Sequence, residues 1–226
     1  MKCFLIYDEK NPVSVAAANR CIESTDLDIE LFQQTSPDTL KEHLTDLPRM
    51  SWTYPLNDQF GIDHETGMIL RPYKTNSMEK KFACTVSHAR LWKKSIELQE
   101  DIMVLEHDAV FIRKFKPFYW KGGVLGLNDP RGSTHSSKIY HQLASSTNGI
   151  TNAPYVTNAL DLPQGLAGNS AYIIKPYFAQ KLLDKLKQVG AWPNDAIMCN
   201  QFFPHELKVV YPYYTKVQGI ESTTTL

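Results

Sequence analysis

The sequence lacks several patterns that would reveal its chemistry directly. It contains neither Gly-x-Gly-x-x-Gly nor Gly-x-x-x-x-Gly-Lys-Ser/Thr, which argues against a dinucleotide-binding fingerprint and a kinase-type phosphate loop. Its four cysteines include no Cys-x-x-Cys pair, so neither a zinc knot nor a disulfide framework is expected. Lysine plus arginine and aspartate plus glutamate both total 24, so the formal net charge is zero and no overall field attracts nucleic acid or an anionic membrane.

Long apolar runs are also missing. No stretch approaches the roughly 20 residues of a membrane span, and Asp8 interrupts the first apolar run too early for a secretory signal. Buried thiols in a reducing bacterial or host-cell cytoplasm are the expected state of the cysteines. A chain of 226 residues that is 42% hydrophobic can bury a substantial core, and we expect one large globular domain rather than two small ones.

Short apolar runs alternate with helical patterns along the chain. Strands are predicted at residues 3–7, 29–32, 102–105, 122–127, 169–174 and 207–211, and helices at 14–23, 39–44, 82–99, 176–189 and 195–202. The initial strand–helix–strand order favours a parallel sheet. Residues 48–77 are predicted to form an ordered loop with aromatic anchors. Residues 129–164 lack periodicity and predict a flexible polar lid or insertion, or a surface loop without a role.

The most informative segment joins a buried strand to two carboxylates. The apolar run at 102–105 is followed directly by Glu106, His107 and Asp108. Open α/β sheets place their ligands at such strand ends, and carboxylate oxygens suit Mg²⁺ or Mn²⁺, which can hold a diphosphate. In an extended chain Glu106 and Asp108 point the same way, so one can ligate a metal while the other orients a ribose or a water. A solvated turn without a ligand is the alternative.

Other candidate residues lie at neighbouring strand ends. His107 either fills space beneath the site or acts as a softer ligand that shifts the preference toward Mn²⁺. Tyr7 and Asp8 end the first strand, where nucleotide-binding sheets meet the base or the ribose, although Tyr7 fits a core position equally well. Gly168 precedes Asn169 in a turn where the backbone can approach a ligand closely.

Three further motifs surround the acidic segment. Cys84-Thr85-Val86-Ser87-His88 precedes it, and Tyr172-Ile173-Ile174 and Pro193-Asn194-Asp195 follow it. This order, from about Phe82 to Ser222, resembles glycosyltransferase family 25, which includes lipooligosaccharide and collagen galactosyltransferases. In that family a Cys-x-x-Ser-His helix precedes an apolar strand ending in Glu-Asp-Asp, whereas here His107 replaces the middle acid.

The resemblance implies a GT-A-type fold: an α/β domain with a Rossmann-like, mostly parallel central sheet and flanking helices. Residues 1–130 would form the nucleotide-sugar-binding half and 131–226 the acceptor-side half. The resemblance implies Mn²⁺ or Mg²⁺ held by Asp108 first and Glu106 second, with His205 as a third ligand of the kind some GT-A enzymes use. It implies Asp195 as the general base for the acceptor hydroxyl, where the alternative is an acid that caps a helix. The predicted donor-binding residues are Tyr7, Asp8, Ser87, His88, Arg90, His107, Gly168 and Asn169. For His88 the alternative is a hydrogen-bonded histidine inside an apolar helix.

The predicted function is metal-dependent transfer of a sugar from a nucleoside-diphosphate sugar, preferably a UDP-sugar, to a hydroxyl of a glycan. The Glu-His-Asp triplet and the length also resemble phage glycosyltransferases, some of which modify hydroxymethylated DNA bases. Basic clusters at 80–94 and 113–121 could bind such a polyanionic acceptor. Two other classes stay open: a phosphoryl-transfer or nucleotide-hydrolysing enzyme, and a non-catalytic sugar- or nucleotide-binding protein with the same fold.

Overall fold

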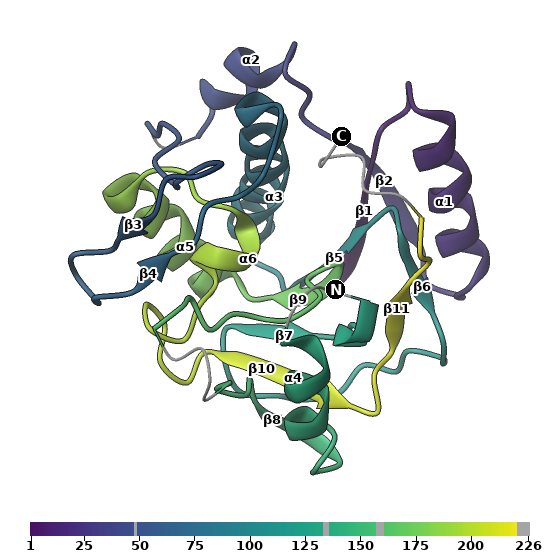
Figure 1. Cartoon of the computed structure of the whole chain (residues 1–226). Coiled ribbons are helices and arrows are strands. Elements are labelled where there is room, and N and C mark those ends of the chain that lie inside the picture. Colours follow the sequence, from purple (N-terminus) through teal and green to yellow (C-terminus); the bar gives the residue numbers. More distant parts are fainter. Residues whose placement is uncertain (48, 133–135, 157–160, 221–226) are drawn as a thin grey trace.

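A computed structural model describes residues 1–47, 49–132, 136–156 and 161–220 (Figure 1). The strands are β1 (Lys2–Tyr7), β2 (Ile29–Gln33), β3 (Gly61–Ile62), β4 (Ile69–Leu70), β5 (Ile102–Glu106), β6 (Ala109–Phe111), β7 (Val124–Gly126), β8 (Gly149–Asn152), β9 (Ala171–Ile174), β10 (Leu207–Tyr211) and β11 (Thr215–Val217). The α-helices are α1 (Pro12–Glu23), α2 (Leu40–Leu44), α3 (Met78–Leu98), α4 (Ser137–Ala144), α5 (Pro176–Val189) and α6 (Asn194–Ile197), and Pro130–Gly132 forms a 3₁₀ turn.

The central sheet has seven strands in the order β2-β1-β5-β9-β7-β10-β8. β1 runs parallel to β2 and β5, and β10 runs parallel to β7. β9 is antiparallel to both of its neighbours, and β8 is antiparallel to β10. Five of the seven strands therefore share one direction, and the carboxyl ends of β1, β2 and β5 meet at one edge. The predicted α/β architecture, a mostly parallel central sheet with flanking helices, is confirmed.

Helices cover both faces of this sheet, which explains why its central strands are continuously apolar. Side chains of α3 and α5 form one core cluster with alternate residues of β1 and β5, among them Phe4 and Val104. Side chains of α1 form the opposite cluster with the intervening residues Leu5 and Met103. The pleat thus decides that Glu106, in step with Val104, faces the α3 side of the sheet.

Residues 129–164, predicted to form a flexible lid, an insertion or a surface loop, contain regular secondary structure in their described part. Helix α4 buries Tyr140 and Ala144 against the domain, and β8 forms the edge strand of the central sheet. A four-residue edge strand pairs with a partner almost 60 positions later, so its own sequence carries little periodic signal. By contrast, the predicted aromatic loop is confirmed in the described part of 48–77. Tyr54 contacts Tyr73 and Trp192 at ring-centroid distances of 6.1 and 5.4 Å.

Candidate active site

The acidic segment lies at the carboxyl edge of the sheet, in a turn rather than an extended strand. β5 ends at Glu106, and residues 107 and 108 turn into β6, so the extended conformation assumed for the triplet is not found. Gln218 holds this turn in place. Its backbone N–H donates to Asp108 O at 2.8 Å, and its side-chain amide donates to His107 O and Ala109 O at 3.3 and 3.1 Å.

The carboxylate of Asp108 is largely enclosed and incompletely hydrogen-bonded. Burial raises the pKa of Asp108 to about 7, the nearby charge of Glu106 acts in the same direction, and a hydrogen bond from Ser170 opposes them. Its Oδ1 atom is buried without a hydrogen-bond partner among the described residues. A hard oxygen with unused lone pairs beside a second carboxylate fits Mg²⁺ or Mn²⁺, which proteins often hold through one or two carboxylates plus substrate phosphates.

The turn before β9 packs against the same edge. Glu106 N donates to Ser170 O at 2.8 Å. Gly168 has a φ of 72° and approaches Asn128 so closely that a Cβ would lie 2.9 Å from Asn128 Nδ2. Asn169 is only 8% exposed, and neither Oδ1 nor Nδ2 has a partner within the described chain. Because an unpaired buried amide is costly, Asn169 is well suited to hydrogen-bond a ligand.

Two of the predicted donor-binding residues on α3 instead anchor the end of β2. The hydroxyl of Ser87 donates to Ala83 O at 2.9 Å and accepts from Thr35 N at 2.8 Å. Ser87 is also 1% exposed, so its prediction as a donor-binding residue is wrong. Arg90 donates to Gln33 O and Thr35 Oγ1 at 3.2 and 3.3 Å. A donor contact of Arg90 stays a prediction, but its bonds seen here are structural.

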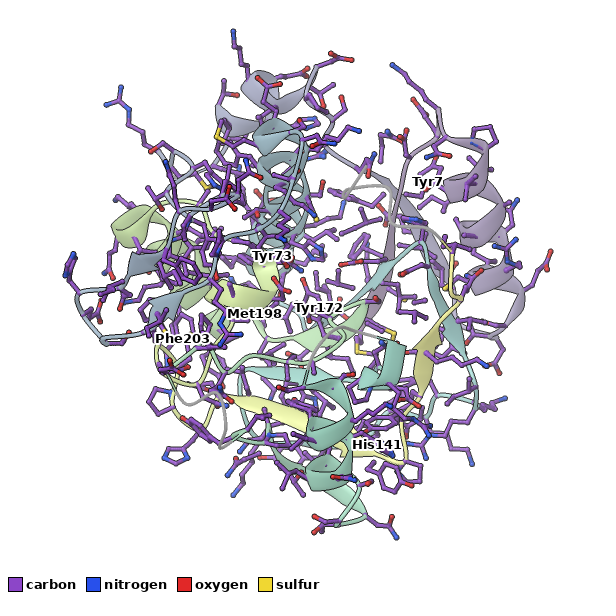
Figure 2. All side chains as sticks on the ribbon, viewed as in Figure 1. Tyr7, Tyr73, His141, Tyr172, Met198 and Phe203 are labelled. Carbon is purple, nitrogen blue, oxygen red and sulfur yellow. The ribbon has the colours of Figure 1, made fainter. Side chains whose placement is uncertain are left out.

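Asp195 faces the carboxylate edge from α6. Tyr73 OH donates to Asp195 Oδ2 at 3.0 Å, and Lys81 Nζ lies 5.0 Å from the centre of the Tyr73 ring. Figure 2 labels Tyr73 near the middle of the molecule, close to the α6 region. Lys81 lies one turn before Cys84 on α3, and its charge acts on both Asp195 and Glu106. A candidate base, a buried cation and a candidate metal ligand are therefore near enough to interact electrostatically.

The surroundings of Asp195 change the pKa of its carboxyl group. The Asp195 side chain is exposed to solvent, yet protein atoms surround its carboxylate on most sides, as expected in a concave site. Burial is the main cause that raises the pKa of Asp195 above the ordinary range, and the charge of Glu106 adds to it. The hydrogen bond from Tyr73 and the charge of Lys81 oppose this shift. A carboxylate of raised pKa is a stronger base, which suits proton abstraction from a hydroxyl.

Replacing Tyr73 by Phe should shift the pH dependence of the reaction. Loss of a hydrogen bond that favours the charged form raises the pKa of Asp195 further, so the ionised base appears only at higher pH. A hydrogen bond to a charged group is worth roughly 1.5–3 kcal/mol, which corresponds to about one to two pH units on the acidic limb of kcat. Tyr177→Phe removes a surface hydroxyl bonded to Glu206 and serves as control. An unmoved acidic limb would contradict this role.

Two cavities meet at Asp195. One, of about 180 Å³, is lined by Tyr54, Arg71, Tyr73, Leu162, Pro163, Asp195 and Ala196. The other, of about 210 Å³, shares Leu162, Pro163 and Asp195 and extends past Tyr140 and residues 164–167. Each is smaller than the roughly 300–1,000 Å³ of typical ligand pockets. Together they form a groove that passes over Asp195, which we call the Asp195 groove.

Gly165 lets the wall of this groove pack directly on α6. A Cβ on Gly165 would lie 2.4 Å from Asp195 O and 2.9 Å from Met198 O. Gly165→Ala should therefore destabilise the fold by about 1–3 kcal/mol through overpacking, which lowers Tm by roughly 2–4 °C per kcal/mol in a domain of this size. Gly61→Ala is the matched control, because its Cβ would meet nothing closer than 3.4 Å. Equal Tm values for the two variants would contradict the packing argument.

The remaining predicted residues divide between the two ends of the sheet. Ile6 pairs with Glu106, so Tyr7 at the end of β1 and Asp8 directly after it lie beside the acidic turn. Burial lowers the pKa of His107, while the nearby charges of Glu106 and Asp8 oppose this. His205 precedes β10, at the amino end of a strand parallel to β7, and is exposed. That edge is opposite to the carboxyl end of β5, so the prediction of His205 as a third metal ligand is wrong.

Sequence analysis missed Tyr73, Lys81 and Gln218 as parts of the site. Tyr73 lies in the predicted aromatic loop at 48–77 and Lys81 in the basic cluster at 80–94, and Gln218 lies outside every motif described above. No local signal could have joined them to the acids, since 122 positions separate Tyr73 from Asp195. The described residues form no cluster of three or more His, Cys, Asp or Glu side chains suited to a metal. A cation here would complete its coordination from substrate or water.

Comparison with known proteins identifies the family of the chain. The model of glycosyltransferase family 25 (LPS biosynthesis protein) matches residues 18–198. No curated protein matches the sequence. Among solved structures, the apo form of mouse xyloside xylosyltransferase 1 matches with a TM-score of 0.38 and 9% identity over 92% of this chain and 84% of that chain. None of the helices in the described part of the chain has the length and apolarity needed to cross a membrane.

Proposed function

The chain belongs to glycosyltransferase family 25, and we propose that it transfers a sugar from a nucleoside-diphosphate sugar to a hydroxyl of a glycan at the cleft between Asp195 and the Glu106–Asp108 turn. The observation that carries this proposal is the meeting of an activated carboxylate, a buried lysine and two further carboxylates at one edge of the sheet. Asn169, whose amide atoms are unpaired within the described chain, precedes Ser170, which hydrogen-bonds to Asp108, and is suited to bind a donor hydroxyl.

In the proposed reaction Asp195 acts as the general base. Its carboxylate accepts the proton of the acceptor hydroxyl, and the hydroxyl oxygen then bonds to the anomeric carbon of the donor. The bond from that carbon to the diphosphate oxygen breaks, and the nucleoside diphosphate leaves with the electron pair. Tyr73 orients the base throughout by donating to Asp195 Oδ2 at 3.0 Å.

The leaving diphosphate needs positive charge nearby. Asp108 and Glu106 would hold Mn²⁺ or Mg²⁺, which when bound supplies Lewis-acid stabilisation of phosphate oxygens. The unpaired Oδ1 of Asp108 supports this assignment. Lys81 adds a second positive group in the cleft, since its charge acts on both Asp195 and Glu106. A UDP-sugar is the proposed donor, with Tyr7 and Asp8 beside the acidic turn as the candidates to contact its nucleoside.

A glycan is the favoured acceptor. The Asp195 groove, with tyrosines and an arginine on its walls, offers the apolar faces and hydrogen-bonding groups that sugar rings need. The basic clusters give less support to a DNA acceptor, because several members are engaged with acids. Lys93 pairs with Glu97, Lys94 with Glu30 and Lys114 with Asp26.

A donor and acceptor panel tests this proposal. We expect the purified chain with Mn²⁺ to transfer label from a UDP-sugar to a glycan, and chelation of Mn²⁺ to stop transfer. Turnover of ATP without turnover of any nucleotide sugar would instead indicate phosphoryl transfer. A labelled product on hydroxymethylated DNA alone would replace the glycan as acceptor. Calorimetry that finds no nucleotide binding in the presence of Mn²⁺ would indicate a non-catalytic protein.

A further inference from the structure

A buried chain of three side chains ends on Glu106. Trp92 Nε1 donates to Tyr172 OH at 2.9 Å, Tyr172 OH lies 2.8 Å from His88 Nδ1, and His88 Nε2 lies 3.2 Å from Glu106 Oε1. Trp92 and Tyr172 are fully buried and His88 is 1% exposed, whereas the Glu106 side chain is 31% exposed. This series of hydrogen bonds thus connects buried side chains of α3 and β9 to one carboxylate oxygen of Glu106.

One assignment of hydrogens satisfies every donor among these four groups. The indole N–H of Trp92 can only donate, so the oxygen of Tyr172 accepts from it. The buried hydroxyl hydrogen of Tyr172 needs an acceptor, and His88 Nδ1 lies within reach at 2.8 Å, so in this assignment Tyr172 donates to it. His88 is left with its proton on Nε2, from which it donates to Glu106 Oε1. Both ring nitrogens are therefore engaged within the protein, and neither is free for a donor phosphate or sugar.

Secondary structure places the chain in register. His88 and Trp92 are four residues apart on α3 and so share one face of the helix. Val104 pairs with Tyr172 in the antiparallel contact of β5 and β9, and Glu106 follows Val104 by two residues on the same face of the sheet. The His88 and Tyr172 rings stack at 5.8 Å with an interplanar angle of 23°, which limits rotation of both.

We infer that His88 is a positioning residue for Glu106, held in one tautomer by Tyr172 and Trp92, and that it binds no substrate. This inference rests on the proposed function, in which Glu106 helps to hold a divalent cation. With Oε1 tethered, Glu106 presents its other oxygen toward the cleft in one orientation. Outer hydrogen-bond partners of this kind typically contribute 10–100-fold to metal affinity or activity.

Tyr172→Phe tests the inference without touching Glu106, and Tyr177→Phe is its control, because Tyr177 OH donates to Glu206 at 2.8 Å on the surface of α5. Nitrogen-15 NMR of the imidazoles, recorded without metal, should show the Nε2–H tautomer for His88 in the parent and a mixed state only in Tyr172→Phe. Mn²⁺ binding followed by electron paramagnetic resonance should weaken about 10–100-fold in Tyr172→Phe and stay unchanged in Tyr177→Phe.

The possible results distinguish a failure of the hydrogen-bond inference from a failure of the proposed function. An Nδ1–H tautomer in the parent would overturn the inference whatever the activity of the protein. An altered tautomer with unchanged Mn²⁺ affinity would show that the chain is only structural and would overturn the positioning role. A parent that binds no Mn²⁺ would overturn the proposed metal site and the positioning role with it, while the NMR result would still establish the hydrogen-bond chain. An Mn²⁺ affinity in His88→Gln close to that of the parent would support the inference, because the glutamine amide can donate to Glu106.

Discussion

Asp195→Asn should lower kcat for sugar transfer by about 10²–10⁴-fold, the usual contribution of a positioned general base. The amide has nearly the same shape and still accepts a hydrogen bond from Tyr73, so the fold and the Asp195 groove should persist. Acceptor KM should change little, since the lost interaction belongs to the transition state. Circular dichroism and Tm confirm folding, and transfer kinetics over a range of pH measure the effect.

The pH profile gives this prediction its sign. Because burial raises the pKa of Asp195, the base is protonated at low pH and activity should rise with pH through a value above the ordinary aspartate range. That rise should disappear in Asp195→Asn. Asp184→Asn, an exposed substitution on α5, is the matched control and should retain full activity. Parental turnover by Asp195→Asn would remove it from the chemistry and leave the helix-cap alternative.

Asp108→Asn should abolish stabilisation of the fold by Mn²⁺ and, with it, transfer activity. A ligand at 100 times its Kd stabilises the folded state by about 2.7 kcal/mol, which corresponds to a Tm increase of roughly 5–11 °C in a domain of this size. We expect an increase of this order in the parent with Mn²⁺ and UDP, and almost none in the variant. Asp184→Asn again serves as control. An equal Tm increase in Asp108→Asn would place the cation elsewhere.

Without metal, the same substitution should change how stability depends on pH. The pKa of Asp108 is about 7 in the folded protein and lies near the ordinary value of about 4 in the unfolded chain. Between these values the folded state binds the extra proton, so the unfolding free energy falls as pH rises, and the penalty is complete above about pH 7. Asp108→Asn removes this penalty, so at pH 8 it should melt higher than the parent. Identical slopes of Tm against pH would contradict it.

The success of sequence analysis at β5 has a physical cause. A strand buried on both faces is a continuous apolar run, so its end, and the acids that follow, are visible without a structure. The position of Asp195 in the first turn of a helix could be predicted for a similar reason, because Pro193 marks the start of that short helix. A turn at 107–108 was only the alternative prediction, since the turn depends on Gln218 and on pairing of β6 with the distant β11.

Sequence alone determined that this chain is an α/β protein with carboxylates at the end of a central strand, because apolar runs and their periodicity can be recognised within short segments. Only the tertiary structure decided which groups accompany them. In the folded chain Tyr73 and Lys81 lie near Asp195, and His88 is hydrogen-bonded to Glu106. Ser87 is buried, and His205 lies at the opposite edge of the sheet. These outcomes depend on side-chain contacts between segments far apart in the chain, and the residue types involved suit a surface or a core position as well as a site.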